Sequence, residues 1–298
     1  MKKLCIAFAA IGLVLLIAGI IIAGIYSSMG YSVDFEDIGL NRSYSDSAEF
    51  VETSVVSESS DIVSTTENSY YHEYPYSTEI KGIELNISAA DVSIDYDEYF
   101  SISASDVDNP KFSESIDENG ILKISYENYD IVNLFQFLDY DIPSVNITLP
   151  SNELNSVKII MEAGSTSIYN INTQKLAVSL TAGDISLSGL NVTESAKFEM
   201  TAGETSIYDS DIKNLEIDKT AGDLNIENSV LTGTIKISST AEDCNINILG
   251  NLEDYSFDVT KTAGNLNING NTSIPDNENA QNKFVISLIA GDIDINIE

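Results

Sequence analysis

The chain has 298 residues, of which 47 are Asp or Glu and 14 are Lys or Arg, and its formal net charge at pH 7 is -33. A negative field of this size repels phosphate backbones and anionic lipid head groups, so it argues against nucleic-acid binding and favours cations or basic partners. One histidine and two cysteines leave little material for a histidine-rich zinc site or a disulfide framework.

The first predicted element is a transmembrane helix. Residues 4–26 contain no charged side chain, and as a helix these 23 residues would span about 35 Å, enough for a hydrocarbon core of roughly 30 Å. No clear small-x-small cleavage site follows, so residues 1–26 are predicted to be an uncleaved signal-anchor, with a cleaved signal peptide as the alternative. Because Lys2 and Lys3 precede the run and Asp34 follows it, the N-terminus is expected in the cytoplasm and the remainder outside the cell membrane.

Residues 27–78 are predicted to form a disordered acidic stalk. The segment is rich in Ser, Thr, Glu and Asp, with Arg42 as its only Lys or Arg. Charge of one sign with little aliphatic content cannot bury enough surface to offset the entropy of ordering. His72, the only histidine, falls in this stalk, so no Ser-His-Asp or Cys-His arrangement is expected inside the folded domain. The protein is therefore not expected to be an enzyme.

The folded domain is predicted to cover residues 79–298. Alternation over residues 83–87 indicates a first strand, and further strands are expected near residues 100–104 and 121–126. Residues 131–140 interrupt the rhythm with Leu134 and Phe135. This segment is expected to cap the open end of a stack of coils, and an aromatic ligand pocket is the alternative.

A repeated phrase organises the remainder of the chain: Thr-Ala-Gly, an acidic residue, and a short alternating strand. Its alanines are at positions 163, 182, 202, 221, 241, 263 and 290, so the steps are 19, 20, 19, 20, 22 and 27 residues. A period near 20 with period-2 alternation indicates a parallel β-helix, or β-solenoid, whose coils share one aliphatic interior. The general crossover rule makes it right-handed. The fold class is thus all-β, preceded by the single N-terminal helix.

These residues carry a resemblance. The sequence Val145-Asn146-Ile147-Thr148-Leu149-Pro150, a polar turn, Val157-Lys158-Ile159 and the serial Ala-Gly-Asp corners resemble the DUF4097 family of bacterial envelope proteins over residues 80–298. The resemblance implies a β-helical, surface-exposed, non-enzymatic adhesin domain, and some relatives accompany envelope-stress regulators. The chain departs from the family at the Phe135 insertion, at Glu242 and at residues 275–282.

The acidic corners are the candidate site. Asp184, Glu204, Asp223 and Asp243 are expected to stack along one edge at about 4.8 Å, with Asn265 and Asp292 continuing the row if the register survives the longer steps. One interpretation is that such residues suit a turn because they bond their own backbone. The other is Ca²⁺ held by the carboxylates and corner carbonyls. No other cofactor is predicted.

Two further positions follow from the alternation. Cys244 takes the place of Leu224 and Leu266 in neighbouring copies, so it is expected in the core as a small hydrophobe without a disulfide. Asn225, Asn245 and Asn267 face outward as ladders that could bind sugar hydroxyls or support the sheet itself.

Three functions remain open after these observations. The first is a membrane-anchored extracellular adhesin-like module that binds a cell-surface or cell-wall ligand through a polar, acidic face. The second is a cell-envelope stress sensor or accessory that acts with another membrane protein through residues 4–26. The third is a polysaccharide-active enzyme using paired carboxylates.

Overall fold

The computed structural model describes residues 61–75, 77–127, 142–277 and 279–298, all of which belong to one compact unit, Val56–Glu298. The predicted membrane segment 4–26, most of the predicted stalk and the predicted cap at 131–140 lie outside the described residues. Within the described ranges, none of the helices has the length and apolar character that crossing a membrane requires. The described chain is almost entirely β-structure, as the alternation predicts, with short 3-10 turns at Asn109–Lys111 and Leu252–Asp254.

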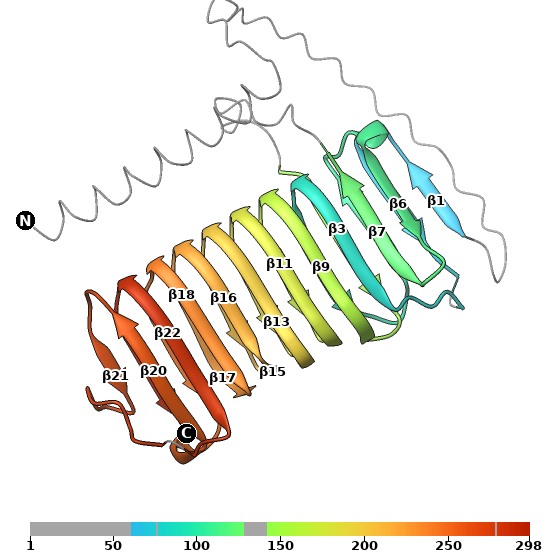
Figure 1. The fold of residues 1–298 in the computed structure, drawn as a ribbon. Helices are drawn as coiled ribbons and strands as arrows, with labels where there is room; N and C mark the ends of the chain where they lie inside the picture. The colour runs from blue at the N-terminus through green and yellow to red at the C-terminus, as the bar shows by residue number, and fades with distance from the viewer. Residues whose placement is uncertain (1–60, 76, 128–141, 278) are drawn as a thin grey trace, which may run out of the picture. The chain divides into compact units, whose positions relative to one another are not determined.

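The strands form two sheets that face each other across a common interior (Figure 1). Sheet A consists of β1 (Ile62–Thr65), β2 (Ser69–Glu73), β4 (Asp91–Tyr96), β5 (Ser101–Ser105), β8 (Ser144–Leu149), β10 (Thr166–Tyr169), β12 (Ile185–Ser188), β14 (Thr205–Tyr208), β17 (Leu224–Thr232), β19 (Cys244–Ile248), β21 (Leu266–Ile268) and β23 (Ile293–Ile297). Sheet B consists of β3 (Gly82–Ala89), β6 (Phe112–Ile116), β7 (Ile121–Tyr126), β9 (Glu153–Ala163), β11 (Asn172–Ala182), β13 (Asn191–Ala202), β15 (Asp211–Lys213), β16 (Leu215–Ala221), β18 (Thr234–Ala241), β20 (Tyr255–Lys261) and β22 (Asn282–Ala290). The C-terminal half of β17 pairs with β15 in sheet B.

The repeats stack in register through the middle of the molecule. In sheet B, β9, β11, β13, β16 and β18 pair in parallel, and the corner alanines of successive coils are partners. In sheet A, β10, β12, β14, β17 and β19 pair in parallel as well. Each repeat therefore contributes one strand to each sheet and turns at its Ala-Gly corner. The right-handed sense of the coils stays a prediction.

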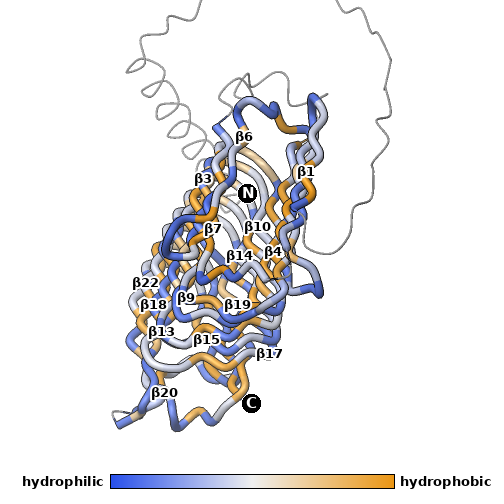
Figure 2. The backbone as a smooth tube through the Cα atoms, turned by 90° about the vertical axis from the view of Figure 1, so that its right-hand side faces the viewer, coloured by the Kyte–Doolittle hydropathy of each residue, from blue (hydrophilic) through white to orange (hydrophobic). Residues whose placement is uncertain are grey.

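The aliphatic residues of all coils share one core. Leu187, Ile207 and Ile226 are each 0 % exposed, and Phe198 and Ile217 face them from sheet B, also fully buried. Burial of each such side chain is worth about 1.5–3 kcal/mol, so the core is the main source of stability. Figure 2 looks at the stack from the end that carries β1 and β6 and colours the backbone by hydropathy.

Both ends of the solenoid depart from sequence order. At one end, β3 pairs with β7 on one side and with β9 on the other, and β4 lies between β8 and β10. At the other end, β22 lies between β18 and β20, and β23 lies between β19 and β21. At the C-terminal end the chain thus skips one coil position and returns to fill it, which the longer final steps of 22 and 27 residues allow. The last two corners therefore stack in the order Asp292, Asn265, the reverse of their order in the sequence. At the N-terminal end the chain adds β7 and β8 on the outer side of β3 and β4, and then crosses that coil to begin β9.

The N-terminal end contains strands that composition did not predict. β1 and β2 form an antiparallel hairpin, β2 pairs antiparallel with β5, and β5 with β8. The predicted stalk boundary at residue 78 is therefore wrong, and folded structure begins by Ile62. The reason is that the tyrosines of this segment bury large aromatic surfaces against the domain. Tyr74 stacks on Phe100 with ring centroids 4.2 Å apart, and Tyr70 packs on Phe112 with ring centroids 4.9 Å apart.

Candidate functional site

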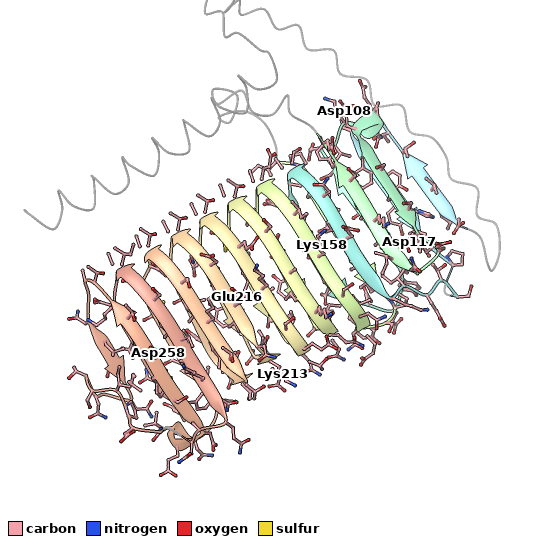
Figure 3. All side chains as sticks on the ribbon, in the orientation of Figure 1. Asp108, Asp117, Lys158, Lys213, Glu216 and Asp258 are labelled. Atoms are coloured by element: carbon pink, nitrogen blue, oxygen red, sulfur yellow. The ribbon has the colours of Figure 1, made fainter. Side chains whose placement is uncertain are left out.

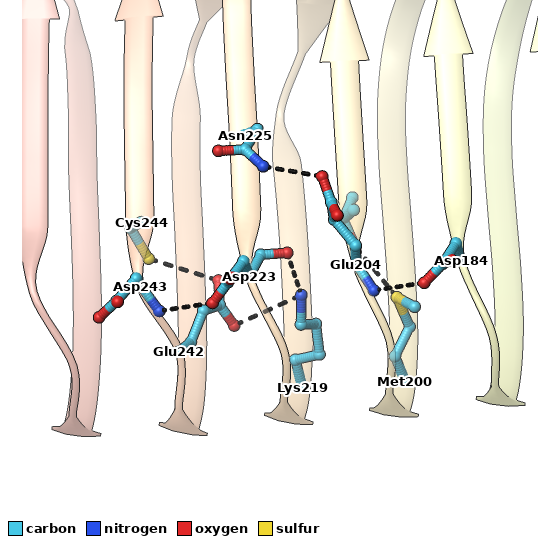
Figure 4. A network of polar contacts seen from close by, with 10 residues as sticks. Asp184, Met200, Glu204, Lys219, Asp223, Asn225, Glu242, Asp243 and Cys244 are labelled. Atoms are coloured by element: carbon cyan, nitrogen blue, oxygen red, sulfur yellow. Dashed lines mark hydrogen bonds and ion pairs between the residues drawn. The ribbon is translucent and has the colours of Figure 1, made fainter.

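The predicted acidic corners form a row along one edge of the solenoid, and their carboxylates bond neighbouring coils. Asp184 Oδ1 accepts the backbone N–H of Glu204 at 2.7 Å, and Asp223 Oδ1 accepts that of Asp243 at 3.4 Å (Figure 4). Glu204 uses its side chain differently, accepting from Asn225 Nδ2 at 2.8 Å. The four predicted residues thus lie on successive coils, with oxygens engaged by backbone or amide donors.

The row continues past Asp243 in spatial rather than sequence order. Asp243 Oδ1 accepts the backbone N–H of Asp292 at 2.8 Å, and Asp292 Oδ1 accepts that of Asn265 at 2.7 Å. Asn265 is therefore the last member of the row, although it precedes Asp292 by 27 residues. The interpretation that these side chains bond their own backbone does not describe these contacts, because each of these carboxylates bonds the next coil.

Calcium binding by Asp184, Glu204, Asp223 and Asp243 stays a prediction. Among the described residues, no group of three or more His, Cys, Asp or Glu side chains converges in a way that could hold a metal ion. A calcium ion in this row would need corner carbonyls and water to complete its six to eight oxygen ligands.

The outer face of sheet A carries a continuous column of small polar side chains, which we call the Ser/Asn column. One member from each paired strand faces solvent, in the spatial order Asn146, Ser93, Ser167, Ser186, Ser206, Asn225, Asn245, Asp294 and Asn267. Some members bond across coils, as when Asn245 Nδ2 donates to Asn225 Oδ1 at 3.2 Å. The predicted outward asparagine ladder is therefore present, interrupted by Asp294 between Asn245 and Asn267.

The described strands of sheet A contain no lysine or arginine, whereas sheet B holds most of the lysines of the described chain. On the outer face of sheet B, Lys158 Nζ lies 2.9 Å from Glu84 Oε1, and Lys236 Nζ lies 2.7 Å from Glu216 Oε1 (Figure 3). The hydrogen bond from Lys236 holds the pKa of Glu216 below its usual range. The two outer faces thus differ in their chemistry. The outer face of sheet B carries ion pairs between lysine and glutamate, while the outer face of sheet A presents hydroxyl, amide and carboxylate groups.

Two polar clusters were not predicted. In the first, Lys219 and Glu242 both have side chains with 0 % exposure, and their Nζ and Oε2 atoms are 3.9 Å apart. Burial lowers the pKa of Lys219 and raises the pKa of Glu242, and the attraction between the two opposes each shift. A sequence signal existed, since Lys219 occupies an inward position of its strand and Glu242 replaces a corner glycine. Nearby, Cys244 lies buried in the core without a disulfide, as the alternation predicts.

The second cluster joins β2 to β6 at the N-terminal end. His72 is buried, and its Nδ1 lies 2.6 Å from Glu114 Oε1, which also accepts from Tyr70 at 2.8 Å. Tyr74 donates to the other oxygen of Glu114, and burial raises the pKa of Tyr70 and of Tyr74. The prediction that His72 lies in a stalk is wrong. Its Nδ1 lies against Glu114 and, at 3.5 Å, the Tyr70 hydroxyl, and its Nε2 lies 3.7 Å from Asp61. These contacts join His72 to carboxylates and a phenol rather than to the serine or cysteine of a triad.

The two-sheet stack of roughly 20-residue coils with serial Ala-Gly corners and a polar outer face defines a β-solenoid. The chain belongs to the DUF4097 family, since the family model described as "Toastrack DUF4097" matches residues 80–296. No curated protein matches the chain in sequence.

Several solved structures are similar to the chain at low identity. A "putative cell adhesion protein" from Clostridium sporogenes is 14% identical, with 77% of this chain and 99% of that chain covered and a TM-score of 0.30. A "putative adhesin" from Bacteroides fragilis is 13% identical, with 78% and 98% covered and a TM-score of 0.29. A "putative lipid binding protein" from Parabacteroides distasonis is also 13% identical, with 78% and 97% covered and a TM-score of 0.28.

Proposed function

We propose that this protein is an adhesin-like binding module of the bacterial cell surface, held in the cell membrane by residues 4–26 with its solenoid outside. The observation that carries the proposal is the Ser/Asn column on a face without lysine or arginine. Membership of the DUF4097 family supports a binding role, and no catalytic activity is proposed.

The Ser/Asn column suits an extended, uncharged, hydroxyl-rich polymer. Its members recur at the strand spacing of about 4.8 Å, and each except Asp294, which only accepts, offers a hydroxyl or amide group that both donates and accepts hydrogen bonds. One such contact is weak in water, but a ligand that engages many coils gains from their combined effect. The negative field of the chain disfavours anionic polymers, so a neutral cell-surface or cell-wall glycan is the ligand class that fits.

The test is a direct binding measurement with matched variants. Ser186→Lys with Ser206→Lys places two cations on adjacent strands of sheet A, and Ser238→Lys with Ser287→Lys places two on adjacent strands of sheet B. Both doubles change the net charge equally. Against a panel of immobilised neutral cell-wall and surface glycans, we expect the sheet A double to weaken binding about tenfold or more, or 1.4 kcal/mol. The sheet B double should bind as the unmodified protein does.

Equal binding by both doubles would exclude the Ser/Asn column as the binding face, and absence of binding to every glycan would exclude the proposed ligand class. The second candidate function, an accessory to another membrane protein, depends on residues 4–26. Deletion of that segment leaves the unit Val56–Glu298 intact. An adhesin without the segment should keep its affinity for glycan, whereas an accessory should lose its effect on its partner.

A further inference from the structure

The coil around Lys219 breaks the rule that inward positions are apolar. In the register of sheet B, Lys219 is the partner of Met200 on one side and Ser239 on the other, and Met200 is itself the partner of Leu180. The Lys219 side chain is fully buried, and its Nζ donates to the backbone carbonyl oxygen of Asp223 at 2.7 Å. An amine in this position has no access to water.

Glu242 brings a carboxyl group to the same place from the next coil. It occupies the corner position that is glycine in most repeats, and its side chain is directed into the core with 0 % exposure. Its Oε2 makes no hydrogen bond and lies 3.9 Å from Lys219 Nζ, while its Oε1 accepts the Cys244 thiol at 3.3 Å (Figure 4). One carboxyl oxygen therefore faces an amine and the other faces a proton donor.

We propose that Lys219 and Glu242 condense to form an intramolecular isopeptide bond that joins two successive coils. The geometry that carries the proposal is the enclosed contact between an amine and a carboxyl group, with the Cys244 thiol on the opposite oxygen. The bond would attach Glu242, in the corner after β18, to Lys219 of β16.

The reaction balances within the pair. The ammonium of Lys219 first passes one proton to the Glu242 carboxylate, so the pair becomes a neutral amine and a neutral carboxylic acid. The Nζ lone pair then attacks the carboxyl carbon, an Nζ–C bond forms, and one C–O bond breaks. The departing hydroxyl leaves with a proton from Nζ as one water molecule, and the product is a secondary amide. No oxidant, reductant or co-reactant takes part.

Burial is what makes this pair reactive. Desolvation disfavours both ions, and the pKa of Lys219 is lowered while the pKa of Glu242 is raised, so the neutral forms that react are favoured. Expulsion of the product water from an apolar core favours the amide over hydrolysis. Lys236 and Glu216 supply the contrast, because their atoms are closer, at 2.7 Å, but both side chains are exposed and the pKa of Glu216 is lowered. They remain ions and cannot condense.

Cys244 touches the reacting carboxyl group and acts as its proton donor. Burial raises the pKa of its thiol, so the thiol stays protonated and polarises the carboxyl group through Oε1. In the neighbouring coil the equivalent residue is Leu224. Cys244→Leu should therefore fold and leave the amine and carboxyl in place, but form the bond more slowly.

The experiment uses the full chain purified in detergent, denatured and digested with trypsin. Trypsin cannot cut after an acylated lysine, so a linked Lys219 predicts one branched species in which residues 214–236 are joined to residues 237–261. Its mass should be the sum of the two peptides less one water, and fragmentation should place the branch at Lys219 and Glu242. Recovery of 214–219 and 237–261 only as separate peptides of sequence mass would overturn the proposal.

Variants drawn from neighbouring coils serve as controls. Lys219→Met and Glu242→Gly install the residues found at the equivalent positions of adjacent coils, and each should abolish the branched species. Lys236→Met removes the closer, exposed lysine and should leave the branch between Lys219 and Glu242 intact. A time course after refolding should show slower bond formation in Cys244→Leu, and an unchanged rate would remove Cys244 from the reaction. Should a variant fail to fold, the digest of the unmodified protein still decides.

Discussion

The glycine corners and the corner at Glu242 make the same turn of the chain with different backbone conformations and different side-chain placement. At Gly203 the backbone has φ +132°, and a Cβ added there would lie 1.7 Å from the carbonyl oxygen of Gly183 on the neighbouring coil. Glu242 does not have a positive φ, and its side chain enters the core instead. Ala90 is the other non-glycine corner, and it too is fully buried. A corner in this solenoid thus has either no side chain or one that lies inside.

Which residue can occupy a corner depends on the core residues that lie beside it. A side chain as polar as Glu242 can lie inside only because the preceding coil supplies Lys219 in place of an apolar residue. The outward acidic positions one residue later are a separate feature, because their oxygens bond the next coil from the solvent side. Two neighbouring residues of one turn therefore make separate contacts, one with the core and the next with the solvent-exposed edge of the adjacent coil.

The largest effect should come from forcing a side chain into a glycine corner. Gly203→Ala meets the backbone of the adjacent coil and adopts a disfavoured φ, so we expect the free energy of unfolding to fall by more than about 3 kcal/mol. Ala90→Gly should cost only about 1 kcal/mol, since that corner already accepts an L-residue. Urea denaturation followed by circular dichroism measures both, and similar losses at the two corners would contradict the distinction.

The next effect should come from isolating Glu242. Lys219→Met leaves a buried carboxyl group without its lysine partner, and we expect a loss of about 3 kcal/mol at pH 7. Lys236→Met on the outer face of sheet B should change the stability by less than about 1 kcal/mol.

The effect of Lys219→Met should also depend on pH with a defined sign. The folded-state pKa of Glu242 is raised by burial, so above the unfolded pKa of 4.5 the unfolded chain loses its proton first and stability falls as the pH rises. The loss in Lys219→Met should therefore be smaller at pH 4 than at pH 7. A loss of equal size at both values would show that Glu242 does not titrate in the interior of the variant.

A smaller effect is expected for the outward acidic row. Asp184→Ala removes the acceptor for the Glu204 N–H, which should cost about 1 kcal/mol, whereas Asp184→Asn keeps an oxygen in place and should cost less. Thermal melts of the two variants under identical conditions test this. If both variants melt like the unmodified protein, the bonds between coils at this edge add nothing to stability.

Calcium should have the smallest effect. The hypothesis that Asp184, Glu204, Asp223 and Asp243 bind Ca²⁺ predicts stabilisation of about 0.4 kcal/mol when the free ion equals its dissociation constant. The melting temperature should then be higher in millimolar Ca²⁺ than in EDTA, and Asp223→Asn with Asp243→Asn should remove the difference. An unchanged melting temperature would exclude the calcium row.

The sequence predicted the fold and the candidate site better in the middle of the molecule than at its ends. The spacing of Ala182, Ala202 and Ala221 was enough to predict coils, a shared core and an acidic edge, because each repeat carries the same local pattern and stacks on a copy of itself. The hairpin of β1 and β2 was missed because averaging over an acidic segment hid the alternating tyrosines. Lys219 and Glu242 were missed as a pair because each looks like an isolated exception until the register is known.

The sequence by itself determined which residues face inward and where the chain turns, since period-2 alternation and the glycine corners are local properties. Only the tertiary structure decided the order of the coils at both ends, because the connecting segments let the chain cross an occupied coil at the N-terminal end and leave one coil position to be filled last at the C-terminal end. It also decided that a lysine and a glutamate 23 positions apart meet out of contact with water, since contacts between coils depend on which strands become neighbours.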